Sequence, residues 1–164
     1  MICVLHGLCL GLAIEIACTA DIRIASADAK LSVKEVDIGV AADIGTLSRL
    51  PKIVGSHSWV KDVTLSARIF SAEEALRVGF VSVVESNKDA AVKKALEMAS
   101  LIATKSPVAV QGTKAIVNWS VDHTVADGLA YTQAWSSAAL QTRDIGEAVG
   151  ATLGKKKGVR FEKL

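Results

Sequence analysis

Three carboxylates stand out because each lies in almost wholly apolar sequence. Glu15 stands within Leu-Ala-Ile-Glu-Ile-Ala, and Glu35 and Asp43 flank the largely apolar segment 36–42. Burying a carboxylate is costly unless it is paired or used, and a pair of such groups could serve as the acid and base of a proton transfer. The alternative is structural. Glu15 would then cap a helix or form an ion pair, and Asp43 would N-cap a helix that begins at 44–46.

The hydrophobic pattern predicts an α/β protein whose strands lie early and whose helices dominate late. Apolar and alternating runs predict short strands, and the residues between two of them, 6–9, read as a loop. A nearly all-apolar stretch around Glu15 predicts a buried helix, and 34–39 is expected to be a loop. The expected strands are 2–5, 21–25, 29–33 and 80–84, and the expected helices are 10–20, 43–53, 56–66, 72–78, 88–105, 106–119, 122–141 and 142–153.

Composition excludes several classes of function. The 164 residues carry 19 Lys and Arg against 17 Asp and Glu, and 4% of them are aromatic, so we expect no nucleic-acid partner. No apolar run approaches the roughly 20 residues of a membrane span. Cys3, Cys9 and Cys18 are odd in number and match no zinc spacing. We therefore expect buried thiols, no disulfide framework and no metal site.

Two stretches of sequence resemble the crotonase (enoyl-CoA hydratase/isomerase) superfamily. The first is His-Gly-Leu-Cys-Leu-Gly-Leu-Ala-Ile-Glu at 6–15, followed by Ala-Asp-Ile-Arg-Ile-Ala at 20–25. The second, Lys-Glu-Val-Asp-Ile-Gly-Val-Ala-Ala-Asp-Ile-Gly-Thr-Leu at 34–47, is similar to the Δ3,5-Δ2,4-dienoyl-CoA isomerase branch, and Lys-Ser-Pro-Val-Ala-Val at 105–110 fits the same branch. The resemblance extends over essentially the whole chain.

This resemblance implies a role for each carboxylate. Asp43 matches the aspartate that removes a proton from C2 of a 3,5-dienoyl-CoA thioester, and Glu35 matches the glutamate that returns a proton at C6. Glu15 stands where the isomerases have an aspartate. Gly11 and Leu12 match the substrate-binding segment, where Leu12 supplies a backbone N–H to the enolate oxygen. Only protons move, so no metal or redox cofactor is expected.

The sequence departs from the family pattern at the same positions. A glycine run is usual where this chain has Gly11, Leu12 and Ala13, and the added side chains are expected to crowd the thioester. Glu15 and Glu35 also reproduce the two glutamates with which enoyl-CoA hydratases add water. Hydratases, however, usually have glycine at the position of Asp43. The sequence therefore favours the isomerase, with the hydratase as an alternative.

The resemblance also predicts the organisation of the chain. Family members are roughly 100 residues longer at the N-terminus, where they supply the first oxyanion N–H and much of the coenzyme A pocket. We therefore expect a partial crotonase core of ββα turns over 1–105 and a helical oligomerisation region over 106–164. A further alternative is a truncated, non-catalytic assembly protein of crotonase ancestry.

Two further expectations concern assembly and location. The apolar helices around 122–141 and 142–153 predict self-association, and the resemblance implies a homotrimer or hexamer. The chain ends in Glu162, Lys163 and Leu164, and the last two residues match a Ser-Lys-Leu peroxisomal address. Glu162 is the wrong kind of residue for that signal. A mitochondrial location, which would need an N-terminal transit peptide, is the alternative.

Overall fold

The structure is a computed structural model that describes residues 1–154, 159, 161 and 162. It divides into two compact units, Met1–Glu97 and Met98–Leu164, each of which is described by itself. The predicted division at 105 stays a prediction. The final Lys-Leu of the expected address lies outside the described residues.

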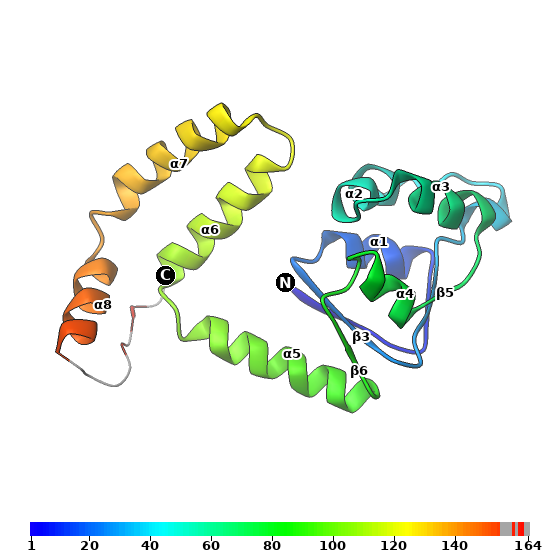
Figure 1. Cartoon of the computed structure of the whole chain (residues 1–164), viewed down its shortest axis with the longest axis horizontal. Helices are drawn as coiled ribbons and strands as arrows, with labels where there is room; N and C mark the ends of the chain where they lie inside the picture. Colours follow the sequence, from blue (N-terminus) through cyan, green and yellow to red (C-terminus); the bar gives the residue numbers. More distant parts are fainter. Residues whose placement is uncertain (155–158, 160, 163–164) are drawn as a thin grey trace. The chain divides into compact units, whose positions relative to one another are not determined.

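The first unit contains two small sheets (Figure 1). In one, β1 (Ile2–Leu5), β3 (Ile22–Ser26) and β6 (Val83–Glu85) are parallel and in that order. In the other, β2 (Leu8–Leu10) is parallel to β4 (Lys30–Ser32), which is antiparallel to β5 (Phe70–Ser71). The α/β prediction is confirmed.

The expected loop at 6–9 contains most of a strand instead. β2 begins at Leu8, and its partner β4 lies some twenty residues further along the chain. Gly7 and Gly11 on either side have positive φ angles of 58° and 51°, so the chain turns sharply before and after it. A three-residue strand made by a distant partner has no local period to detect.

The helices of the first unit cover these sheets (Figure 1). α1 (Leu12–Thr19) packs against α2 (Thr46–Ile53), which is followed by α3 (His57–Ser66) and α4 (Ala72–Arg77). The core between them is continuous and includes Ile14, Leu31, Leu50, Phe70 and Phe80, each at most 1% exposed. The segment 34–39, expected to be a loop, forms the short 3₁₀ helix η1 (Glu35–Ile38).

The C-terminal end of α1 is fixed by an arginine from β3. The guanidinium of Arg23 donates to the carbonyls of Ala20 (2.6 Å) and Ala17 (3.3 Å), and to that of Phe80 (2.6 Å). The last carbonyls of a helix have no intrahelical partner, and a cation there is stabilising. α1 therefore has a fixed position between the parallel strands and α2.

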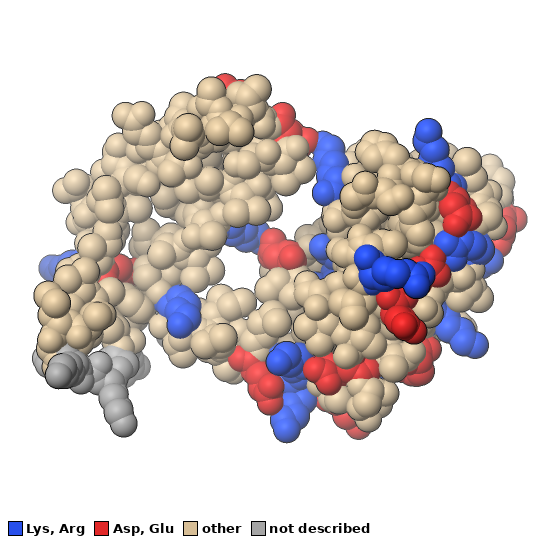
Figure 2. All heavy atoms as spheres, in the orientation of Figure 1, with Lys and Arg blue, Asp and Glu red and all other residues tan. Residues whose placement is uncertain are grey.

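The second unit is helical and contains no strand in its described part. α5 (Lys88–Ala103) leads into it, and α6 (Pro107–Ser120), α7 (Val125–Ala139) and α8 (Arg143–Leu153) follow. α6 packs against α7, and charged side chains are sparse over both helices (Figure 2). The helix expected at 122–141 begins at Val125, because Thr124 and Asp127 form a capping box.

No helix in the described part of the chain is both long enough and apolar enough to cross a membrane.

Candidate active site

The N-terminus of α1 carries the two residues predicted to bind substrate. Gly11 is its N-cap, with φ 51° and ψ −114°, and Leu12 is its first residue. The N–H of Gly11 donates to the carbonyl of Ser32 in β4 (2.9 Å). The first N–H groups of a helix have no intrahelical acceptor and point out of its positive end. The segment Gly11–Leu12, the α1 N-terminal turn, can therefore stabilise negative charge on a bound oxygen.

Glu35 lies directly against this turn, although 24 positions separate it from Gly11 in the chain. A Cβ atom added to Gly11 would lie 3.1 Å from Oε1 of Glu35 and 3.6 Å from its Cδ. The other oxygen, Oε2, is buried and has no hydrogen-bond partner among the described residues. An unpaired buried carboxylate oxygen is unfavourable. The Glu35 carboxylate is therefore a candidate to act beside the α1 N-terminal turn.

Glu15 lies one turn further along α1 and is 4% exposed. Its Oε1 accepts the backbone N–H of Ile44, at 3.1 Å. A charge-assisted hydrogen bond of this kind is stronger than a neutral one. Glu15 therefore connects α1 to the loop that carries Asp43, the residue before Ile44.

Asp43 is exposed and precedes α2. The alternative in which it N-caps that helix is wrong, because the N-cap is Gly45 and the cap has no side-chain hydrogen bond. Gly45 can take this place because its φ of 126° is available to glycine. The structural alternative therefore does not account for Asp43.

The apolar residues around the carboxylates are themselves exposed. Leu12 is 56% exposed, Ile38 78%, Val40 45% and Ile44 63%. Their sequence suggested a buried setting for the carboxylates, but among the three only Glu15 is classed as buried. The site therefore lies beside an apolar surface that an acyl chain or another polypeptide segment could cover.

Leu12 and Ala13 replace the usual glycines without backbone strain. Ala67 is the one described non-glycine residue with a positive φ, so Leu12 and Ala13 both have ordinary helical angles. At the start of a helix, side chains lean back toward the N-terminus. The Leu12 side chain is thus expected to border the space above its own N–H.

Ser32 is a site residue that the sequence analysis missed. Its contribution to the turn is a main-chain carbonyl, and every residue has one. No sequence signal could have identified it.

A parallel β-α arrangement that brings carboxylates to the N-terminus of a buried helix is suited to acyl-thioester chemistry. The chain belongs to the enoyl-CoA hydratase/isomerase family, whose model matches residues 1–162. The expected crotonase-like fold is confirmed by solved structures. A putative enoyl-CoA hydratase/isomerase from Mycobacterium abscessus superposes with a TM-score of 0.91 at 25% identity, over 99% of this chain and 66% of that one.

Curated relatives are more similar in sequence. A mitochondrial Delta(3,5)-Delta(2,4)-dienoyl-CoA isomerase from Mus musculus is 45% identical over 166 residues, covering all of this chain and 51% of the relative. A peroxisomal isomerase of the same name from Arabidopsis thaliana is 43% identical over 164 residues, covering all of this chain and 58% of the relative. The chain spans about half the length of these relatives.

Proposed function

We propose that this chain carries the catalytic carboxylates of an isomerase that converts 3,5-dienoyl-CoA into 2,4-dienoyl-CoA. The observation that carries the proposal is the Glu35 carboxylate, which lies against the α1 N-terminal turn with one buried oxygen unpaired. That is where an acid would be needed beside a group that stabilises enolate charge. The 45% identity to dienoyl-CoA isomerases supports the same reaction.

In the proposed reaction Asp43 takes a proton from C2 of the thioester. The electron pair moves into the carbonyl, and the resulting negative oxygen accepts the N–H of Leu12 at the positive end of α1. Protonated Glu35 then donates its proton to C6, so the double bonds move from positions 3 and 5 to positions 2 and 4. Exchange with solvent returns both carboxyl groups to their starting forms.

Glu15 has a supporting role in this proposal. Its hydrogen bond to the N–H of Ile44 holds the adjacent Asp43 at a constant distance from α1. A carboxylate occupied in this way is less available to activate water. This contact favours the isomerase over the hydratase, in which Glu15 and Glu35 together would add water.

The test is the absorbance of the conjugated product. The purified protein is mixed with 3,5-dienoyl-CoA, and formation of the conjugated 2,4-dienoyl chromophore is followed. We expect Asp43→Asn and Glu35→Gln each to lower the rate by about 10²–10⁴, the usual contribution of general acid–base catalysis. Asp37→Asn is the matched control, because Asp37 lies on η1 beside Glu35 but pairs with Lys34 at the surface.

Each outcome distinguishes the candidates. Undiminished turnover in Asp43→Asn would remove Asp43 from the mechanism. Hydration of a 2-enoyl-CoA without diene isomerisation would support the hydratase. No turnover of either substrate would support the non-catalytic assembly protein, and the mass of the native polypeptide, measured by intact mass spectrometry, would then show whether a longer chain carries the activity.

We also propose that the second unit mediates self-association into a homotrimer or hexamer. Its exposed apolar side chains include Val125 (81%), Leu129 (65%), Leu140 (61%) and Leu153 (80%). Apolar faces of this kind are typical of subunit interfaces. A stable 17.2-kDa monomer in sedimentation at micromolar concentration would contradict this proposal.

For location, we propose that this protein acts in peroxisomes or mitochondria, since the similar isomerases are named for one or the other. The last three residues, Glu162-Lys163-Leu164, match the peroxisomal address Ser-Lys-Leu at two positions and depart from it at Glu162. A fluorescent protein carrying the last ten residues tests this address, and a diffuse cytosolic signal would exclude it.

A further inference from the structure

We infer that Ser32 is a positioning residue for the α1 N-terminal turn, and that Ser32 is itself held through an arginine-centred clamp at the end of α3. The clamp consists of Arg68, Asp62, Glu74 and Trp59. The effect of the clamp on catalysis rests on the proposed function. The effect of the clamp on the geometry of the α1 N-terminal turn does not.

Ser32 connects two parts of the first unit through its backbone and its side chain. Its carbonyl accepts the N–H of Gly11 at 2.9 Å, and its hydroxyl donates to the carbonyl of Ala67 at 2.7 Å. The residue is fully buried. The hydroxyl bond to Ala67 fixes where the end of β4 lies. A buried carbonyl left without a donor is unfavourable, so the Ser32 carbonyl in turn holds the N–H of Gly11. Glu35 follows three residues later in the chain, so this strand end places both Gly11 and Glu35.

Ala67, the acceptor of that bond, has an unusual backbone conformation. Its φ of 50° and ψ of 21° lie in the left-handed region, where alanine is disfavoured. Such a conformation persists only where the surroundings impose it. Ser66 and Arg68 on either side supply that constraint: the Ser66 hydroxyl donates to the carbonyl of Asp62 (2.6 Å) and accepts the N–H of Arg68 (3.3 Å).

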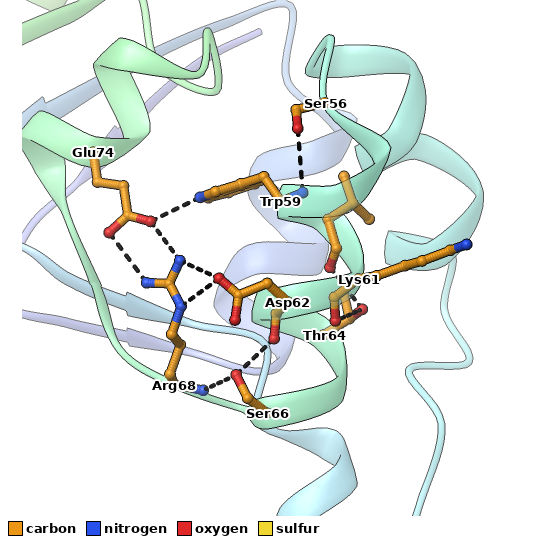
Figure 3. Close-up of polar contacts among 9 residues, drawn as sticks. Ser56, Trp59, Lys61, Asp62, Thr64, Ser66, Arg68 and Glu74 are labelled. Carbon is orange, nitrogen blue, oxygen red and sulfur yellow. Dashed lines mark hydrogen bonds and ion pairs between the residues drawn. The ribbon is translucent and has the colours of Figure 1, made fainter.

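The Arg68 side chain completes the constraint (Figure 3). Its guanidinium pairs with Asp62 at 2.6 Å and donates to both oxygens of Glu74, at 3.1 Å and 2.6 Å. The indole N–H of Trp59 donates to the same carboxylate at 2.7 Å. Bidentate pairing of this kind fixes direction as well as distance. The clamp thus joins α3 and α4 on either side of Ala67.

A path of hydrogen bonds and backbone links therefore runs from the clamp to the site. Arg68 holds the left-handed turn at Ala67, Ala67 holds Ser32, and Ser32 holds the N–H of Gly11. Removing either the Ser32 hydroxyl or the Arg68 guanidinium should release the α1 N-terminal turn while leaving the sheet of β1, β3 and β6 in place. Mobility of this turn would misplace Leu12 N–H and Glu35 together.

Amide hydrogen exchange, measured residue by residue by NMR, tests this directly on the whole chain. In Ser32→Ala we expect the amide of Gly11 to exchange roughly tenfold faster, with a smaller change at Ile24 in β3, because local opening and global unfolding are separate events. Arg68→Met should act in the same direction. Arg68→Lys keeps the positive charge but lacks the planar guanidinium that donates to two oxygens at once. We therefore expect Gly11 to exchange more slowly in Arg68→Lys than in Arg68→Met.

Two controls and a kinetic measurement complete the design. Ser58→Ala and Arg143→Met remove the same groups at exposed positions outside the path, and we expect wild-type exchange at Gly11. With 3,5-dienoyl-CoA, Ser32→Ala should lower kcat with little change in KM. Uniform acceleration of exchange at Gly11 and Ile24, or unchanged protection of Gly11, would overturn the inference. If the wild type has no isomerase activity, the proposed function fails, but the exchange data still decide this inference.

Discussion

A single methyl group added at Gly11 should disturb both the backbone of the α1 N-terminal turn and the carboxylate beside it. The φ of 51° and ψ of −114° at Gly11 lie outside the regions open to residues with a Cβ. An added Cβ would also lie 3.1 Å from Oε1 of Glu35, a separation that requires the carboxylate to move by a few tenths of an ångström. Gly11→Ala therefore perturbs the backbone of the turn and the position of the proposed acid together.

The expected loss of stability follows from two opposing terms. A strained backbone conformation costs about 1–3 kcal/mol, whereas replacing glycine by alanine restricts the unfolded chain and returns about 0.4–1 kcal/mol. At the middle of these two ranges the net destabilisation from the backbone is about 1.3 kcal/mol, before the contact with Glu35 is included. For a chain of this length each kcal/mol lowers Tm by about 2–4 °C, so we expect a fall of roughly 3–5 °C.

The assay is thermal unfolding followed by circular dichroism, with a double-mutant cycle. Gly150→Ala is the matched control, because Gly150 lies in α8, has no positive φ and has open space at its Cβ position. It should be neutral or stabilising, by up to about 1 kcal/mol. In a Glu35→Ala background, Gly11→Ala should still lower the stability through backbone strain, but it should no longer lower it through contact with the Glu35 carboxylate. If Gly11→Ala unfolds at the same temperature as Gly150→Ala, the reasoning is wrong.

Three further predictions concern pH, thiol reactivity and substrate shape. Hydrogen bonding to Arg68 holds the pKa of Glu74 below its ordinary value of 4.5. The stabilisation from this ion pair should be complete above pH 4.5 and should be lost as the pH falls through the lower pKa of Glu74 in the folded protein. In Glu74→Gln the free energy of unfolding should therefore depend less on pH over this interval. Burial raises the pKa of Cys18 to about 11, so a thiol reagent at pH 8 should label it only after denaturation, and labelling in the native state would contradict its burial. Leu12→Gly should raise kcat/KM for 2-methyl-branched dienoyl-CoA relative to the straight chain, with Leu65→Ala as an exposed control; an unchanged ratio would show that Leu12 does not border the acyl site.

The proposals together describe a site assembled around one helix end. The α1 N-terminal turn offers the N–H of Leu12, Glu35 lies against it, and Glu15 holds the loop of Asp43. The similar isomerases are about twice as long as this chain. The experiments therefore also measure how much of the chemistry these 164 residues can perform.

The sequence by itself determined the fold class and most of the helices. Helix ends with side-chain caps depend on the local sequence, because a cap is a local hydrogen bond: Ser56, Ser71 and Ser106 each accept an N–H from the first turn of the helix that follows. The motifs around 6–15 and 34–47 were also sufficient to indicate the family.

Only the tertiary structure decided which groups meet. Local sequence made Asp43 a plausible helix cap, but the cap is Gly45, and Glu15 takes the neighbouring N–H of Ile44. The approach of Glu35 to Gly11 and the two bonds of Ser32 join segments far apart in the chain. Contacts of this kind depend on how β2 and β4 pair and on a single backbone carbonyl, neither of which has a signature in local residue patterns.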